Sequence, residues 1–195
     1  MKEGLSEIIC IIDASGSMKL IKNDAIGGFI SFLDEQKKLP GDATLTLIQF
    51  NTDYDVIHEN KPLSEVNPIR DKDYIPTGST ALLDAVGKAI DSTGRRLAST
   101  SEEHRPEKVI VAILTDGEEN ASTSYDLPTI KDMIRHQKEK YSWEFIFLGA
   151  NQDSFAEAAK IGIESKDTIN FAATDDGIRT AYSEMSNSIT TYRKK

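Results

Sequence analysis

Short runs of consecutive apolar residues recur along this chain. Runs of this length, rich in β-branched residues, predict strands that are buried on both faces of a parallel sheet. The first run, Ile8-Ile9-Cys10-Ile11-Ile12, ends abruptly at Asp13. Later apolar segments predict further strands over residues 109–115, 143–148 and 168–171.

Between these runs, apolar residues recur every three or four positions, which is the spacing of an amphipathic helix. Three predicted helices cover residues 19–33, 81–97 and 126–140, and a short fourth helix follows Asp153. The last helix begins at Thr174 or Asp175, one of which is expected as the N-cap, and ends near Tyr192. Ser154 and Glu157 stand at capping-box spacing, and Thr80 or Ser79 lies at the N-terminus of the helix over 81–97. Thr80 could serve as the N-cap there and could also bind a metal through its hydroxyl. Gly27-Gly28 lowers helix propensity, and close packing against the sheet would offset that cost.

One pair of strands is joined by a tight turn. Residues 44–50 alternate between apolar and polar side chains, and 51–53 predict a turn into a strand over 54–58. Two strands joined in this way must be antiparallel, so the second one is expected at an edge of the sheet. Residues 59–79 show little periodicity and contain several prolines, which predicts a long surface connection.

Strands alternate with helices nearly throughout the chain. This order predicts a three-layer, Rossmann-like α/β fold: a mostly parallel six-stranded sheet with one antiparallel edge strand and helices on both faces. A chain of 195 residues can bury one core and is short for two. We therefore expect a single domain over residues 1–195.

Composition and charge narrow the functional classes. The net charge of −9 argues against binding to nucleic acid or to an anionic membrane surface. The single cysteine, Cys10, lies inside the first strand and offers neither a disulfide framework nor a zinc site. No stretch approaches the roughly 20 apolar residues of a membrane span, and the acidic N-terminal segment does not resemble a signal peptide. These features predict a cytoplasmic protein.

Acidic and hydroxyl side chains follow two of the predicted buried strands. Asp13, Ser15 and Ser17 alternate after the first strand, and Asp116 follows the strand over 109–115. Parallel strands would bring both carboxylates to one edge of the sheet, where ligands of open α/β sheets bind. Asn151 and Asp153 fall at the same edge. Oxygen donors there suit a hard cation, although Asp and Ser residues also form turns and helix caps.

Three segments in this order resemble the von Willebrand factor A (VWA) domain family, and the resemblance extends from Leu5 to about Tyr192. The segments are Asp13-Ala14-Ser15-Gly16-Ser17, Gly78-Ser79-Thr80-Ala81-Leu82 and Leu114-Thr115-Asp116-Gly117-Glu118. Together they match the three parts of the family's metal-ion-dependent adhesion site (MIDAS). The resemblance implies five metal-binding residues: Asp13, Ser15, Ser17, Thr80 and Asp116. Thr77 is the alternative threonine, but Thr80 fits the spacing of the family better.

The resemblance also implies a metal and a kind of partner. Hydroxyl and water ligands suit Mg²⁺, with Mn²⁺ or Ca²⁺ as alternatives. An ion with few direct carboxylates keeps much of its charge, and it would take an Asp or Glu of a partner protein as a further ligand. Intracellular relatives often work with AAA+ ATPases or in multiprotein assemblies. Glu118 and Glu119 could repel an acidic partner, select basic residues around its acid, or point away.

An enzyme is the competing interpretation: a Mg²⁺-dependent hydrolase or phosphoryl-transfer enzyme that uses the same edge of the sheet. Haloacid-dehalogenase-like phosphatases need a second Asp where Ser15 stands, and a general base would have to be Glu118 or Glu119. The chain contains no nucleophile elbow and no phosphate-binding glycine loop. The sequence therefore favours a metal-dependent protein-binding module over an enzyme.

Overall fold

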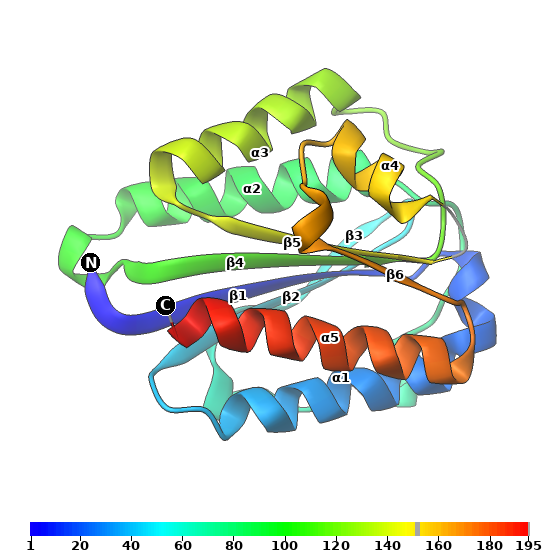
Figure 1. Ribbon diagram of the computed structural model, residues 1–195, viewed down its shortest axis with the longest axis horizontal. Helices are drawn as coiled ribbons and strands as arrows, with labels where there is room; N and C mark the ends of the chain where they lie inside the picture. The colour runs from blue at the N-terminus through cyan, green and yellow to red at the C-terminus, as the bar shows by residue number, and fades with distance from the viewer. Residues whose placement is uncertain (151–152, 195) are drawn as a thin grey trace.

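The computed structural model describes residues 1–150 and 153–194. In this part of the chain, six strands form one sheet in the order β3-β2-β1-β4-β5-β6 (Figure 1). The strands are β1 Lys2–Asp13, β2 Ala43–Phe50, β3 Tyr54–Pro62, β4 Pro106–Thr115, β5 Glu144–Ala150 and β6 Thr168–Phe171. Only β2 and β3 pair antiparallel, and β3 lies at the edge. The predicted sheet is confirmed.

Helices cover both faces of the sheet (Figure 1). They are α1 Lys22–Lys37, α2 Leu82–Ser99, α3 Leu127–Tyr141, α4 Ser154–Lys160 and α5 Asp175–Lys194. Apolar residues of α1 and α5 pack on one face, and those of α2, α3 and α4 pack on the other. The predicted three-layer α/β fold is therefore confirmed. No helix in the described part of the chain is long and apolar enough to cross a bilayer.

The strand β1 lies at the centre of the sheet, between β2 and β4. Its side chains alternate between the two layers: Ile9 and Ile11 belong to the core under α2 and α3, whereas Cys10 belongs to the core under α1 and α5. All three side chains are buried, as the continuous apolar run predicts. The buried thiol of Cys10 is part of the core.

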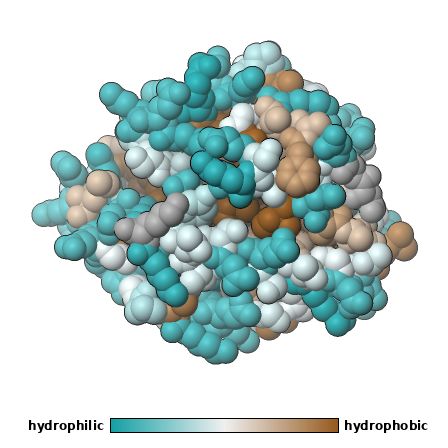
Figure 2. Space-filling model, in the orientation of Figure 1, coloured by the Kyte–Doolittle hydropathy of each residue, from teal (hydrophilic) through white to brown (hydrophobic). Residues whose placement is uncertain are grey.

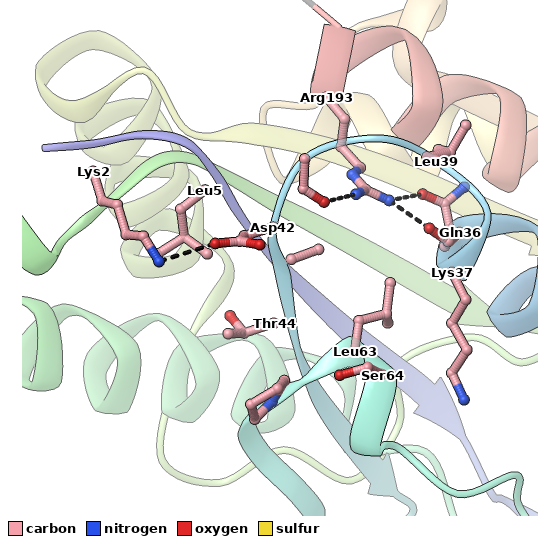
Figure 3. A pocket seen from close by; sticks show the side chains of 13 residues that line it. Lys2, Leu5, Gln36, Lys37, Leu39, Asp42, Thr44, Leu63, Ser64 and Arg193 are labelled. Atoms are coloured by element: carbon pink, nitrogen blue, oxygen red, sulfur yellow. Dashed lines mark hydrogen bonds and ion pairs between the residues drawn. The ribbon is translucent and has the colours of Figure 1, made fainter.

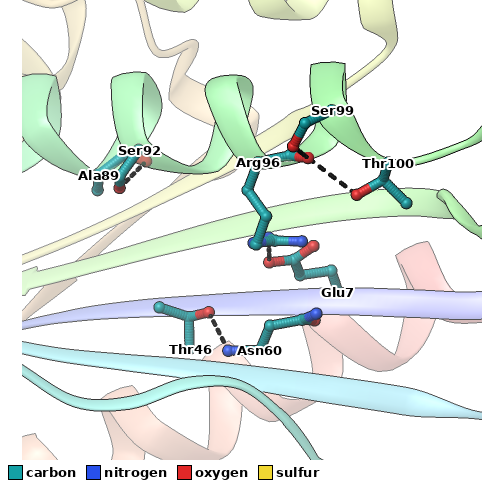
Figure 4. A network of polar contacts seen from close by, with 8 residues as sticks. All are labelled: Glu7, Thr46, Asn60, Ala89, Ser92, Arg96, Ser99 and Thr100. Atoms are coloured by element: carbon teal, nitrogen blue, oxygen red, sulfur yellow. Dashed lines mark hydrogen bonds and ion pairs between the residues drawn. The ribbon is translucent and has the colours of Figure 1, made fainter.

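One buried carboxylate lies in the amino-terminal half of β1. Glu7 is fully buried, and the guanidinium of Arg96, which comes from α2, donates a hydrogen bond to its Oε1 (Figure 4). The other carboxylate oxygen, Oε2, has no hydrogen-bond partner among the described residues. Burial raises the pKa of Glu7, and the hydrogen bond and charge of Arg96 oppose that shift. The negative charge of Glu7 in β1 is thus balanced by the guanidinium of Arg96 inside the protein.

The prediction of a surface connection over residues 59–79 is confirmed in part, because most of these residues are exposed but several are not. The first four of these residues extend β3 to Pro62. Beyond them the backbone is irregular, but four side chains are buried in the core beneath α1 and α5: Leu63, Val66, Ile69 and Tyr74. The turn Leu63–Glu65 contacts both α1 and β2. The segment therefore covers one end of the sheet, and its irregular spacing hid this role from a search for periodicity.

The glycine pair in α1 serves contact between helices instead of contact with the sheet. A Cβ atom at Gly28 would lie 2.3 Å from Cδ2 of Tyr182 on α5, whereas a Cβ at Gly27 would meet open space. The rings of Phe29 and Tyr182 meet edge to face, with their centroids 6.4 Å apart. Gly28 therefore allows α1 and α5 to approach each other closely.

The caps of three helices differ in how well the sequence predicted them. Asp126 caps α3 by accepting a hydrogen bond from Thr129 N, and Thr174 Oγ1 accepts one from Gly177 N at the start of α5. The capping box at Ser154 is wrong, because Asp153 caps α4 and the buried Ser154 hydroxyl donates to Asn170 Oδ1 instead. Asn151, expected at the same edge, lies outside the described residues.

The face seen in Figure 2 is mostly hydrophilic. Hydrophobic residues gather there in small patches, near the middle and at the right-hand edge, which is the side where β1 ends in Figure 1. Two of the most exposed apolar side chains of the chain, Leu20 and Ile75, belong to segments that follow β1 and precede α2. Part of the exposed apolar surface therefore belongs to the segments at the carboxyl ends of the strands.

Candidate metal centre

The strands β1 and β4 end side by side. They pair in parallel from Ser6 to Ile12 of β1, and Ile12 lies opposite Leu114. Asp13 is the last residue of β1, and Asp116 directly follows β4. The chain after Asp13 turns into a short 3₁₀ helix, Gly16–Ile21, before α1 begins. The two carboxylates therefore meet at one edge of the sheet, as expected from the sequence.

Hydrogen bonds join four of the five predicted metal-binding residues. Ser15 N donates to Asp13 Oδ1 over 2.6 Å, and the hydroxyl oxygens of Ser15 and Ser17 are 3.0 Å apart. Ser17 Oγ donates to Asp116 Oδ1 over 2.6 Å. Ser15 occupies the N-cap position of the 3₁₀ helix, but its side chain makes no capping hydrogen bond. Its hydroxyl is therefore directed to the cluster and not to the helix.

Gly117 shows that Thr80 faces the same cluster. A Cβ atom at Gly117 would lie 2.9 Å from Thr80 Oγ1, 3.7 Å from Ser17 Oγ and 3.8 Å from Asp13 Oδ2. Three oxygens from the segments 13–17 and 78–82 thus lie around Gly117 of the third segment, in a small space that any larger side chain would fill. Thr80 is buried, whereas Thr77 is exposed. The structure places Thr80, and not the alternative Thr77, beside the other four residues.

The segment before α2 is fixed to the end of β1 by its backbone. Gly16 N donates to Gly78 O over 3.1 Å, and Thr77 N donates to Ala14 O over 2.8 Å. Gly78 has a φ of +73°, and a Cβ atom there would lie 2.9 Å from Thr52 Oγ1. Both the positive φ and the close approach require glycine at this position. These contacts place the following Thr80 at the cluster.

Of the two roles left open for Thr80, capping of α2 is not the one that the structure shows. Ala81 occupies the N-cap position without any side-chain hydrogen bond. Side chains of the loop after β4 supply the acceptors instead: Asn120 Oδ1 for Thr80 N, Glu119 Oε2 for Leu83 N, and Ser122 Oγ for Asp84 N. Because the loop performs the capping, the Thr80 hydroxyl is not needed for it.

Glu119 points away from the cluster. Besides Leu83 N, its carboxylate accepts hydrogen bonds from Ala121 N, Ser122 N and Ser122 Oγ, over 2.7–2.9 Å. Glu118 is exposed. The pKa of Lys160 on α4 is raised mainly by Glu157 and to a smaller extent by Glu118. The sequence left open whether these two acids repel an acidic partner, select basic residues or point away. Glu119 points away and accepts hydrogen bonds from backbone N–H groups.

Asp84 is a supporting residue that sequence reasoning missed. Its carboxylate accepts hydrogen bonds from the backbone N–H groups of three consecutive residues, Thr123, Ser124 and Tyr125, over 2.9–3.1 Å. Burial alone would raise the pKa of Asp84, but these three donors lower it. The sequence could have indicated this role, because Asp84 interrupts the otherwise apolar residues 82–86 at the start of a predicted helix. Asp84 and Glu119 together hold the loop that carries Asp116.

The two acids of the cluster lack an internal counter-charge. Burial raises the pKa of Asp13 to about 6, against the hydrogen bonds from Thr115 and Ser15, and Asp116 adds to the rise. Burial also raises the pKa of Asp116, against the hydrogen bond from Ser17. No described Lys, Arg or His side chain forms an ion pair with either residue. The arrangement therefore favours binding of a cation.

The donor set also indicates which cations fit. No group of three or more His, Cys, Asp and Glu residues in the described chain could hold a metal. The cluster instead combines two carboxylates with three hydroxyls. Such hard oxygen donors suit Mg²⁺, Mn²⁺ or Ca²⁺ and lack the imidazole or thiolate that zinc sites normally use. The residues present thus fit the hard divalent cation that the sequence predicts.

A larger hollow lies at the opposite edge of the sheet (Figure 3). It has a volume of about 510 Å³, and its basic side chains have partners. Lys2 pairs with Asp42 over 3.0 Å, and Arg193 Nη1 donates to the backbone oxygen of Gln36 over 2.9 Å. Its charged groups already have partners, so the cluster at Asp13 is the better candidate for a functional site.

A comparison with models of protein families identifies the family to which this α/β chain belongs. The family described as von Willebrand factor type A domain matches residues 7–184. This chain belongs to the VWA family. A comparison with curated protein sequences found no match.

Solved structures share the fold at low sequence identity. Proximal thread matrix protein 1 from the mussel byssus is 16% identical with a TM-score of 0.66, and the match covers 97% of this chain and 46% of that one. The chain thus spans about half the length of the mussel protein. The vWF domain of the type V pili tip protein Mfa5 from Porphyromonas gingivalis is 8% identical, with a TM-score of 0.66 and 95% of both chains covered. Another structure of the mussel protein is described as having a zinc-occupied MIDAS motif.

Proposed function

We propose that this domain is a protein-binding module that depends on a divalent metal, held by Asp13, Ser15, Ser17, Thr80 and Asp116. The convergence of these oxygens without an internal cation carries the proposal. Mg²⁺ is the proposed ion, with Mn²⁺ and Ca²⁺ as alternatives, because the donors are hard. VWA domains are commonly protein-interaction modules, which agrees with this assignment.

The chemistry of the donors explains how such an ion would recognise a partner. Three of the five donors are neutral hydroxyls, so the bound ion would have few carboxylate ligands, keep much of its positive charge and attract a further anionic ligand. A carboxylate of an Asp or Glu on a partner protein supplies that charge. Asp84 and Glu119 hold the Asp116 loop in place for this contact. We further propose that the domain works in the cytoplasm and that its partner is an AAA+ ATPase or a member of a multiprotein assembly.

The positions of Glu118 and Glu119 support binding over catalysis. A hydrolase at this site would need a general base, and these two residues were the candidates. Glu119 is engaged with the N-terminus of α2, and Glu118 is exposed beside Lys160. We therefore propose that the domain is not an enzyme. A phosphate-release assay over a panel of small esters tests this directly, and release that depends on Asp13 would contradict it.

Thermal unfolding in Mg²⁺ and in EDTA tests the metal centre. Mg²⁺ should raise the melting temperature of the wild type, and Asp116→Ala should abolish that rise while the fold is retained. Ser17→Ala should weaken it. Thr77→Ala is the matched control, because Thr77 lies in the same segment as Thr80 but is exposed. An unchanged metal response in Asp116→Ala would remove Asp116 from the site.

Capture of partners from a cell lysate tests the second half of the proposal. The domain is used as bait in Mg²⁺ and in EDTA, and bound proteins are identified by mass spectrometry. We expect a partner that is captured only with Mg²⁺ and is lost with Asp116→Ala. Equal capture under both conditions would mean that the metal does not take part in the interaction.

A further inference from the structure

A second, smaller hollow lies next to the candidate metal centre. It has a volume of about 180 Å³ and is bounded by the ends of β1 and β2, the start of β3 and the segment before α2. Its walls include Ala14, which directly follows Asp13, and Gln49, Asp55, Asp73 and Ile75. Because Ala14 directly follows Asp13 in the chain, this Gln49 hollow adjoins the end of β1 that carries the candidate metal centre.

Gln49 has an unusual side chain for its position in β2. The residue is only 6% exposed, and its buried Nε2 has no hydrogen-bond partner among the described residues. A buried amide without partners is costly, and such groups in folded proteins usually have a partner or a role. The side chain lines the hollow, so a carbonyl group of a bound ligand could accept the missing hydrogen bond.

The charges in the hollow are not balanced. The carboxylate of Asp73 is already paired, since Arg70 Nε and Nη2 donate to it over 2.5 and 3.1 Å. Asp55 is exposed and takes part in no ion pair or side-chain hydrogen bond found in the described residues. Ile75, with 66% of its surface exposed, adds an apolar edge. A free carboxylate beside an apolar edge matches a basic side chain with its methylene stem.

We propose that the Gln49 hollow binds a basic side chain of the same partner whose Asp or Glu binds the metal. The Lys or Arg of that partner pairs with Asp55 and lays its stem on Ile75, while a neighbouring backbone carbonyl accepts from Gln49 Nε2. The recognised segment therefore carries an acidic and a basic residue within a few positions of each other. This inference rests on the proposed function, and it names the chemistry of the partner.

An array of synthetic peptides tests the pairing. Each peptide carries one Asp, with Arg, Ala or Glu at one of the four positions on either side, and is probed with the intact domain in Mg²⁺ and in EDTA. In Mg²⁺, the best Arg peptides should bind about three- to fivefold more tightly than their Ala counterparts, as expected for a partly exposed ion pair. Asp55→Asn should remove this preference and leave the Mg²⁺-induced rise in melting temperature unchanged.

Asp53→Asn is the matched control. Asp53 is an exposed acid in the turn just before β3, two residues from Asp55, and does not line the hollow, and its replacement changes the net charge equally. An Arg preference that survives Asp55→Asn, or that Asp53→Asn removes equally, overturns the assignment. Mg²⁺-dependent binding of Asp peptides without any preference for Arg also overturns it and leaves the proposed function standing. Absence of Mg²⁺-dependent binding to every peptide contradicts both.

Discussion

Two buried carboxylates on the same strand, Glu7 and Asp13, differ in how the fold treats them. Both are fully buried, both are on the side of β1 that faces α2, and burial raises the pKa of both. Glu7, toward the amino end of the sheet, is paired with Arg96 (Figure 4). Asp13, at the carboxyl end, has hydroxyl and backbone donors and a second acid, Asp116, beside it.

The difference extends to the surroundings of each end. At the amino end, Lys2 pairs with Asp42, and Arg193 donates to Gln36 and Gly41 (Figure 3). At the carboxyl end, Asp84 and Glu119 accept hydrogen bonds from backbone N–H groups. Asp13 and Asp116 accept hydrogen bonds from neutral donors, and neither forms an ion pair with a basic side chain of the described residues. The fold therefore supplies an internal cation for the buried Glu7 and, among the described residues, none for Asp13 and Asp116.

The largest expected effect comes from removing the internal cation. Arg96→Met should destabilise the protein by about 3–5 kcal/mol, because Glu7 would remain buried without its partner. A carboxyl whose pKa is raised in the folded state favours folding of the protonated form, so this loss should shrink as the pH falls from about 7 toward 5. Urea unfolding at both pH values measures it. The double variant Glu7→Leu with Arg96→Met should recover most of the stability; if it does not, the unpaired charge is not the cause.

A smaller loss is expected when the support of the Asp116 loop is removed. Asp84→Ala should cost about 3 kcal/mol, because three backbone N–H groups lose their acceptor. It should also weaken the stabilisation by Mg²⁺, since the loop carries Asp116. Asp91→Ala, on the same helix and bonded only to the Tyr125 hydroxyl among the described contacts, is the control and should cost less. Equal losses in the two unfolding curves would argue against a special role for Asp84.

The pH dependence of the metal effect sharpens the comparison further. Since the pKa of Asp13 is about 6, protons and Mg²⁺ compete for it, and the Mg²⁺-induced stabilisation should fall by up to about 1.4 kcal/mol per pH unit below that value. In EDTA the sign is opposite: the raised pKa makes the protein more stable as the pH falls from 7 toward 5. Unfolding curves at a series of pH values, with and without Mg²⁺, measure both slopes. Parallel slopes would mean that Asp13 does not bind the ion.

The smallest effect distinguishes two buried glutamines, one from each end of the sheet. Gln49→Leu should stabilise the protein by about 1 kcal/mol, because a buried amide without partners is replaced by an apolar group. Gln36→Leu should destabilise it, because the Gln36 amide donates to Ser186 and Thr190 and accepts from Arg193. Chemical denaturation of both variants gives the comparison, and a loss of stability in Gln49→Leu would show that its amide is satisfied in solution.

The sequence alone determined the architecture and the outline of the site. Apolar runs and helical spacing are local patterns, so they located the strands of the parallel sheet, its antiparallel edge and the main helices. Two buried strands that each lead into an Asp implied that Asp13 and Asp116 meet. The resemblance of three motifs to the VWA family implied Ser15, Ser17 and Thr80 as their companions.

Only the tertiary structure decided which polar groups are satisfied by other segments. Glu119 and Asp84 accept hydrogen bonds from residues that lie tens of positions away or in another loop, and the burial of Tyr74 depends on what α1 and α5 leave uncovered. The unpaired amide of Gln49 and the free carboxylate of Asp55 likewise show only once every neighbour is in place. Hydrogen bonding and burial depend on distances in space, and a pattern along one chain segment carries no record of them.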